Sequence, residues 1–270
     1  MTVPAETHRL DDETARANLA AHEFDRDWLE SHLQEERHRA SLLGEIREAI
    51  FGMQDGLVST VAVASTVAGA SGQRLPVLVA GIASALAGVF SMAAGEYMSS
   101  KSQKEIFEAQ ISGEREEVAE RPGEAQAEVV FMLEEEGLPR DKASDVAATF
   151  ARHPEVLLST MIARELGLTG DHAEGSPAQG ALVMGVAFGA GAVVPILPYL
   201  FLSVQAGIIG SLLLTAAVLF GIGVVKSRWT RRNWLRSGLE ILALGAFGGI
   251  AGYLFGSLLP ALLGAPPSPS

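Results

Sequence analysis

Five stretches of the sequence are apolar over the length of a membrane-spanning helix. They cover roughly residues 49–70, 76–98, 179–200, 203–225 and 238–262. A bilayer core about 30 Å thick needs about 20 apolar residues of α-helix to cross it. The pattern therefore predicts an all-α integral membrane protein with five transmembrane helices.

Basic residues predict the orientation of these spans, because Lys and Arg are retained on the cytoplasmic side. Arg47 precedes the first span, Lys101 and Lys104 follow the second, and five basic residues lie between the fourth and fifth: Lys226, Arg228, Arg231, Arg232 and Arg236. The first forty residues are charged and do not resemble a signal peptide. We expect a multi-pass protein of a bacterial inner or plasma membrane, with a cytoplasmic N-terminus and an external C-terminus.

The long polar segment at residues 99–177 is too long for a passive connector. Its pattern predicts three or four short helices, broken at Pro122, at Gly137-Leu138-Pro139 and at Pro154, with Asp141 in a first turn. It holds 17 acids against 8 Lys and Arg, a net charge of −9. We therefore expect a small helical cytoplasmic domain that attracts cations.

Composition excludes several classes of protein. The net charge of −12 argues against a nucleic-acid partner, and the absence of cysteine excludes disulfides and thiolate metal sites. The spans contain no histidine, and the chain has no Walker-type phosphate loop. We therefore expect neither an intramembrane protease nor an ATP-driven pump, and no enzyme.

Asp55 is the most informative polar residue, because it lies inside the first predicted span. An ionised carboxylate there costs at least a few kcal/mol, so it is a functional candidate by default. The alternative is that Asp55 is hydrated near the interface or paired with a basic residue such as Arg47, as a folding feature only.

Met92 and Glu96 lie one helical turn apart in the second predicted span. Because the first two spans run antiparallel, Asp55 and Met92 each lie about 9 Å from their cytoplasmic ends and should face each other at one depth. A carboxylate with a thioether suits a borderline-soft ion such as Fe²⁺. A lone methionine in an apolar helix is more often simple packing.

Carboxylates at helical spacing also occur in the polar insertion, at Glu114, Glu117, Glu124 and Glu128. Like charges on one helix face repel unless a cation bridges them. Met161 and Glu165 add a second Met and carboxylate pair. The alternative is a solvated acidic face without a bound ion.

Two further patterns have simpler interpretations. Glu35 and His38 have the Glu-x-x-His spacing of a di-iron bundle, but the segment before the first span offers too few helices, which favours a solvated or membrane-surface helix over residues 10–45. Gly245, Gly249, Gly252 and Gly256 follow the small-xxx-small pattern of membrane-helix packing.

Two motifs together resemble the vacuolar iron transporter family. They are Asp55-Gly56-Leu57-Val58-Ser59 in the first span, and Met92 followed by Gly95-Glu96-Tyr97-Met98-Ser99 in the second. The resemblance covers about residues 45–262. It implies a homodimer that moves Fe²⁺, and in some members Mn²⁺, out of the cytoplasm in exchange for protons.

The same resemblance assigns roles to residues. It implies metal ligands in the transport path at Asp55 and Met92, with Glu96 beside them. In the cytoplasmic domain it implies ligands at Glu114, Glu117, Glu128, Met161 and Glu165. A further family glutamate falls here on Ala125; the neighbouring Glu124 offers a carboxylate in its place, which leaves the number of ions open.

These observations predict five parts along the chain: a charged helical N-terminal segment (1–46), spans one and two (47–98), an acidic metal-binding domain (99–177), spans three to five (178–263) and a disordered tail (264–270). No permanent cofactor is expected. The transported ion is Fe²⁺ or else Mn²⁺, Zn²⁺ or Co²⁺, which share these ligands. The rival hypothesis is a membrane-anchored metal buffer or sensor without transport activity.

Overall fold

A computed structural model of the chain describes residue 17, residues 26–167 and residues 176–262. The regular elements in these ranges are all α-helices: α2 (Arg26–Ser71), α3 (Arg74–Glu120), α4 (Pro122–Glu135), α5 (Arg140–Ala151), α6 (Pro154–Arg164), α7 (Pro177–Phe201), α8 (Val204–Thr230) and α9 (Trp234–Leu262). The chain divides into two compact units, residues 1–42 and 43–270.

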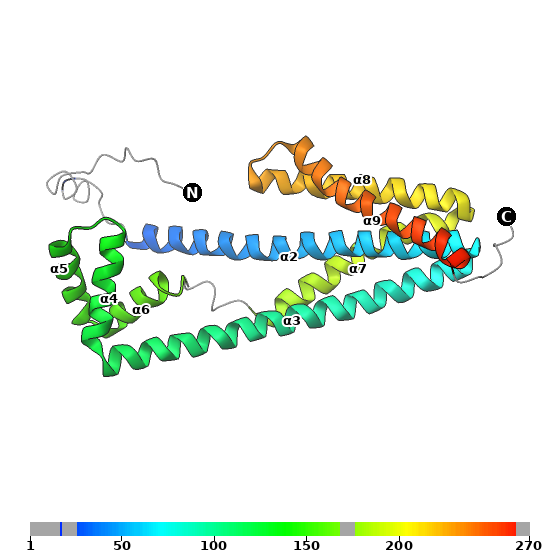
Figure 1. Ribbon diagram of the computed structural model, residues 1–270. Coiled ribbons are helices and arrows are strands. Elements are labelled where there is room, and N and C mark those ends of the chain that lie inside the picture. Colours follow the sequence, from blue (N-terminus) through cyan, green and yellow to red (C-terminus); the bar gives the residue numbers. More distant parts are fainter. Residues whose placement is uncertain (1–16, 18–25, 168–175, 263–270) are drawn as a thin grey trace. The chain divides into compact units, whose positions relative to one another are not determined.

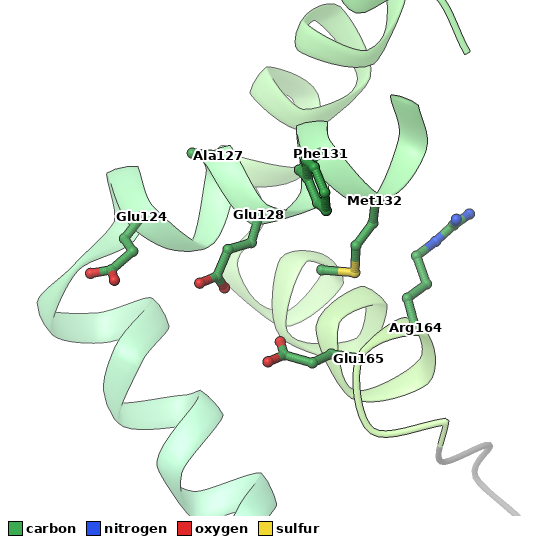
Figure 2. A pocket seen from close by; sticks show the side chains of 7 residues that line it. All are labelled: Glu124, Ala127, Glu128, Phe131, Met132, Arg164 and Glu165. Carbon is green, nitrogen blue, oxygen red and sulfur yellow. The ribbon is translucent and has the colours of Figure 1, made fainter. Parts of the chain in front are cut away.

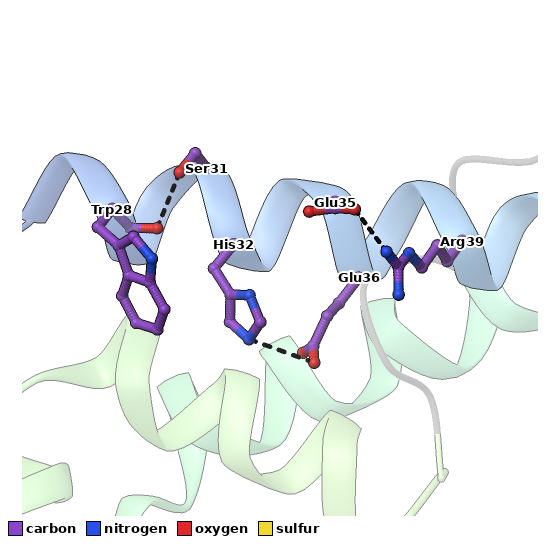
Figure 3. Close-up of polar contacts among 6 residues, drawn as sticks. All are labelled: Trp28, Ser31, His32, Glu35, Glu36 and Arg39. Atoms are coloured by element: carbon purple, nitrogen blue, oxygen red, sulfur yellow. Dashed lines mark hydrogen bonds and ion pairs between the residues drawn. The ribbon is translucent and has the colours of Figure 1, made fainter.

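The first unit contains the start of α2, an exposed polar helix. Its side chains pair along the helix: Trp28 stacks on His32, and Arg39 Nη2 lies 2.6 Å from Glu35 Oε1 (Figure 3). The expected helix at 10–45 is thus present from residue 26 onward, while residues 10–25 lie outside the described residues except for Ala17.

Two of the helices continue beyond the predicted spans. α2 joins the N-terminal helix to the first span without interruption, and α3 extends 22 residues past residue 98. No proline occurs in α2 or in α3 after its first turn, where Pro76 lies. Neither helix therefore ends where its side chains change from apolar to polar. The backbone hydrogen bonds of a helix lie within the helix itself, so they persist where it leaves the membrane.

Four described helices are long and apolar enough to cross a membrane: α2, α3, α7 and α8. α3 leaves large apolar side chains exposed along one side, including Leu75, Ile82 and Phe90. Contiguous apolar surface of this kind belongs against lipid or a partner. The structure therefore describes a multi-pass membrane protein with at least these four candidate spans.

Glycines bring these helices close together. A Cβ atom on Gly56 would lie 2.2 Å from the carbonyl oxygen of Phe188, and one on Gly191 would lie 2.3 Å from that of Met53. α2 and α7 therefore cross almost backbone to backbone, as small residues allow in membranes. The hydroxyl of Ser211 on α8 donates to the carbonyl of Pro195 on α7 at 2.8 Å.

The glycine pattern of the last helix is explained in part. A Cβ atom on Gly245 of α9 would lie 2.0 Å from Leu219 Cδ1 of α8, so this position serves helix packing as predicted. Gly249, Gly252 and Gly256 lie outside the residues whose side-chain surroundings are described. The predicted kink residues Pro195 and Pro198 both lie within α7.

The polar insertion contains the predicted breaks. α3 ends at Glu120 just before Pro122, Gly137 takes a φ of +95° between α4 and α5, and Pro154 begins α6. Figure 1 shows α4, α5 and α6 gathered at the C-terminal end of α3. We call these three helices with the C-terminal part of α3 the insertion domain.

A small apolar core holds the insertion domain together. It contains alanines and larger apolar side chains, drawn from all four helices: Val118, Ala125, Val129, Leu133, Ala143, Ala147, Leu157, Leu158 and Met161. On α4 the core positions Ala125, Val129 and Leu133 repeat every four residues. The core side chains therefore occupy one face of α4, and Glu124 and Glu128 lie on the adjacent face, outside the core.

The close crossing of α2 and α7 leads to a stability prediction. Gly191→Ala should destabilise the protein by about 1–3 kcal/mol, because its methyl group would overlap the backbone of Met53. Gly221→Ala on α8 is the matched control, since nothing lies within 4 Å of its Cβ position. Thermal unfolding in detergent measures both; equal midpoints would contradict the packing described here.

Candidate metal-binding sites

Three carboxylates meet where α3 passes into α4. Glu117, Glu124 and Glu128 each offer an oxygen, and these oxygens all lie within 4.8 Å of one another. Glu117 and Glu128 are partly buried, while Glu124 is exposed. The chain changes direction between Glu120 and Pro122, so residues of two successive helices reach one point. Such an oxygen set can hold a divalent cation.

The electrostatics of this cluster extend to Glu114 and Glu165. Partial removal from water, together with the negative charges of Glu165 and Glu117, raises the pKa of Glu114. Glu128 is affected more strongly: burial first, then the charges of Glu117 and Glu165, raise its pKa to about 7. Five carboxylates from α3, α4 and the end of α6 are therefore linked by pairwise repulsion, and we call them the carboxylate cluster.

Two buried oxygen atoms of the cluster lack an ordinary hydrogen-bond donor. Glu114 Oε2 and Glu117 Oε1 are buried and accept no hydrogen bond from an N–H or hydroxyl group of the described residues; the carboxyl group of Glu128 lies close enough to Glu117 to share a proton with it. Buried polar atoms normally have partners, and a buried carboxylate oxygen without one is costly. A bound cation supplies what these two atoms lack, so the residues present fit a divalent metal ion.

A pocket of about 490 Å³ opens beside the cluster. It is lined by Glu124, Ala127, Glu128, Phe131, Met132, Arg164 and Glu165. Figure 2 shows Glu128, Met132 and Glu165 pointing into the same space. Met132 was missed in the sequence analysis, although Glu124, Glu128 and Met132 share one face of α4 at spacings of four residues.

Met161 lies elsewhere. It is fully buried in the apolar core of the insertion domain, where Ala125 is also fully buried. It therefore does not line the pocket, and its proposed ligand role stays a prediction. Position 125 of this chain is an alanine buried in the core, and the neighbouring Glu124 contributes to the carboxylate cluster.

The two residues predicted to bind metal within the membrane lie on different helices. Asp55 on α2 and Met92 on α3 are both half-buried. No ion pair within the described part of the chain involves Asp55, so the alternative in which Arg47 neutralises it is not supported. Joint binding of an ion by Asp55 and Met92 stays a prediction.

A second acidic group lies nearer the polar ends of these helices. Glu96 accepts a hydrogen bond from Ser100 Oγ at 2.6 Å, and its charge acts on Glu48 of α2. Glu48 Oε2 is buried without a hydrogen-bond partner among the described residues. Glu45, one turn earlier, accepts from Gln179 Nε2 at 2.6 Å. Sequence reasoning missed Glu48, although it precedes Asp55 by seven residues and so shares its helix face.

The Glu35 and His38 pair does not form a cluster with other metal-binding side chains in the described residues. Glu35 is instead engaged by Arg39, and both residues are exposed. An exposed ion pair on a charged helix is the ordinary solvated arrangement. This agrees with the interpretation of the segment as a solvated helix.

Comparison with known proteins identifies close similarities. The sequence pattern of the VIT family matches residues 46–257. Vacuolar iron transporter 1 of Oryza sativa subsp. japonica is 32% identical over 224 residues, which is 82% of this chain and 88% of the relative. Vacuolar iron transporter 1 of Arabidopsis thaliana is 32% identical over 212 residues, 78% of this chain and 84% of the relative.

A more distant relative covers a similar range. Protein CCC1 of Saccharomyces cerevisiae is 25% identical over 225 residues, 79% of this chain and 69% of the relative. The matched region includes the membrane helices with Asp55 and Met92 as well as the whole insertion domain. The family match over most of the sequence and the length of these alignments lead to one conclusion: this chain belongs to the VIT family.

Proposed function

We propose that this protein carries a divalent metal ion, ferrous iron foremost, out of the cytoplasm in exchange for protons. The family consists of transporters rather than enzymes, and relatives are named vacuolar iron transporters. The observation that carries the proposal is Asp55, a half-buried carboxylate in an apolar span that no described Lys or Arg neutralises. A transported cation gives that carboxylate a partner.

The insertion domain is proposed to receive the ion. Its five clustered carboxylates attract divalent cations from the cytoplasm, and their unpartnered oxygens can replace water in the ion's coordination shell. The thioether of Met132 beside Glu128 and Glu165 adds a softer ligand. Soft ligands favour Fe²⁺, Mn²⁺, Co²⁺ or Zn²⁺ over Mg²⁺ and Ca²⁺, and availability in the cell decides among the first four.

The membrane path is proposed to begin at Glu48 and Glu96. Asp55 lies two helical turns beyond Glu48, about 10 Å along α2, and Met92 lies one turn beyond Glu96 on α3. An ion can therefore pass from one pair of ligands to the next along the same two helices. Several sites in series, none of which holds the ion too tightly, allow an ion to enter a path and leave it again.

Proton exchange follows from the chemistry of the ligands. A carboxylate must lose its proton before it binds metal well, so loading the site releases protons and reprotonation ejects the metal. Protons arriving at Asp55 from the far side would thus drive release in the outward direction.

The topology proposed for this cycle has five spans, with the N-terminus and the insertion domain in the cytoplasm and the C-terminus outside. α9 supports the fifth span, since its 22 residues from Ile241 to Leu262 carry no charge. We further propose a homodimer in which exposed apolar faces of the spans meet, in a bacterial inner or plasma membrane.

The first test of the proposal is metal flux in reconstituted vesicles. The vesicles contain the wild-type protein in their membrane and a metal-sensitive dye inside, and a pH gradient is imposed across them. They should show Fe²⁺ flux that depends on this gradient. Asp55→Asn should reduce this flux at least about tenfold, because the neutral amide cannot both bind the ion strongly and exchange a proton.

The control for this test is Asp145→Asn, which removes an exposed carboxylate on α5 and should leave flux unchanged. Flux independent of the gradient would eliminate proton coupling. Metal binding without any flux in the wild type would instead support the rival hypothesis of a membrane-anchored buffer or sensor.

The second test is the pH dependence of metal binding. Because the pKa of Glu128 is raised to about 7, a proton occupies this ligand below neutral pH and leaves it above. Metal affinity should therefore rise about tenfold between about pH 6 and pH 8. Mn²⁺ binding to the full-length protein, followed by electron paramagnetic resonance, measures this rise.

Glu128→Gln should weaken Mn²⁺ binding and flatten its pH profile in that range, whereas Glu155→Gln, an exposed acid in the first turn of α6, should change neither. An unchanged profile in Glu128→Gln would show that a different group competes with the metal for protons.

A further inference from the structure

One cation lies among the clustered carboxylates. Arg121, the residue between α3 and α4, places Nη2 3.1 Å from Glu117 Oε2 and Nη1 2.7 Å from Glu124 Oε2. The two carboxylates lie one turn before and one turn after the arginine. Its guanidinium therefore bridges two of the three residues that offer oxygens within 4.8 Å of one another.

No other Lys or Arg in the described ranges pairs with these three carboxylates. Arg164, which lines the adjacent pocket, pairs with Glu136 instead. Arg121 engages Oε2 of Glu117 and leaves Oε1 of the same group buried without a basic partner, close to the carboxyl group of Glu128. The arginine thus neutralises part of the cluster and leaves oxygens of Glu117 and Glu128 facing one another.

We propose that Arg121 is a built-in competitor for the metal ion, an internal cation that lowers the affinity of the carboxylate cluster. This inference rests on the proposed function of the cluster as a site for transported metal. The guanidinium and a divalent ion cannot both engage all the oxygens of Glu117 and Glu124. Metal binding displaces the arginine, and metal release is assisted by its return.

The exposure of Arg121 makes this exchange physically simple. Its side chain is 57% exposed, so the guanidinium can turn into water at little energetic cost, and exposed ion pairs of this kind are individually weak. With no metal bound, the arginine prevents the carboxylates from repelling one another apart, and the ligand geometry persists. A transport protein benefits from such a site, because an ion that binds too tightly is not passed on.

The test is Mn²⁺ affinity of the full-length protein in detergent, for the wild type and Arg121→Gln. Loss of the competing charge should tighten binding about tenfold and slow Mn²⁺ dissociation, and the difference should shrink at high salt. Arg121→Lys retains the charge and should bind close to the wild-type level. Arg152→Gln, on an exposed residue whose hydrogen bond goes to Thr149, controls for net charge alone.

The variants distinguish failure of the arginine's proposed role from failure of the metal site. Unchanged or weaker Mn²⁺ binding in Arg121→Gln, with Arg121→Lys binding like the wild type, would overturn it. Glu117→Gln separates this from failure of the site itself: if that variant binds Mn²⁺ as well as the wild type does, the cluster is not the metal site and both proposals fall. Loss of binding in Glu117→Gln together with tighter binding in Arg121→Gln supports both.

Discussion

A carboxylate that is short of water needs a cation or a proton to neutralise it, and this requirement applies both in the insertion domain and in the membrane helices. In the insertion domain, burial and mutual repulsion raise the pKa of Glu128 to about 7. In the membrane helices, Asp55 lies in an apolar segment without a basic partner among the described residues. Both places hold negative charge that protein groups neutralise only in part, and metal ions or protons can complete the neutralisation.

The length of α3 links these two places mechanically. Its 47 residues extend about 70 Å and carry Met92 and Glu96 in the predicted span, then Glu114 and Glu117 in the insertion domain. Beyond Pro76 in its first turn, α3 contains no proline, the commonest cause of a sharp kink. The proposed ligands at both levels are therefore held on one continuous helix.

Much of this arrangement could be predicted from the sequence, because it depends on local rules. Pro122, Gly137 and Pro154 break the insertion where expected. Glu117, Glu124 and Glu128, which the sequence offers at helical spacing, lie together in the structure, while their role as metal ligands stays a prediction. Other features depend on tertiary packing and carry no local signal. Burial of Met161 in the core, rather than at the pocket, follows from how α6 packs against its neighbours. The uninterrupted course of α2 and α3 was missed because a change in polarity was treated as a helix boundary.

The pairing of Arg121 with Glu117 and Glu124 shows why a count of ligands gives an incomplete account of the site. Five carboxylates alone would bind a divalent ion tightly and release it slowly, which suits storage. In our proposal, the arginine that pairs with two of them lowers the metal affinity without removing a ligand. The proton that competes at Glu128 acts in the same direction, so this site combines a high charge with moderate retention. That combination is what a site in a transport pathway requires and what a storage site does not.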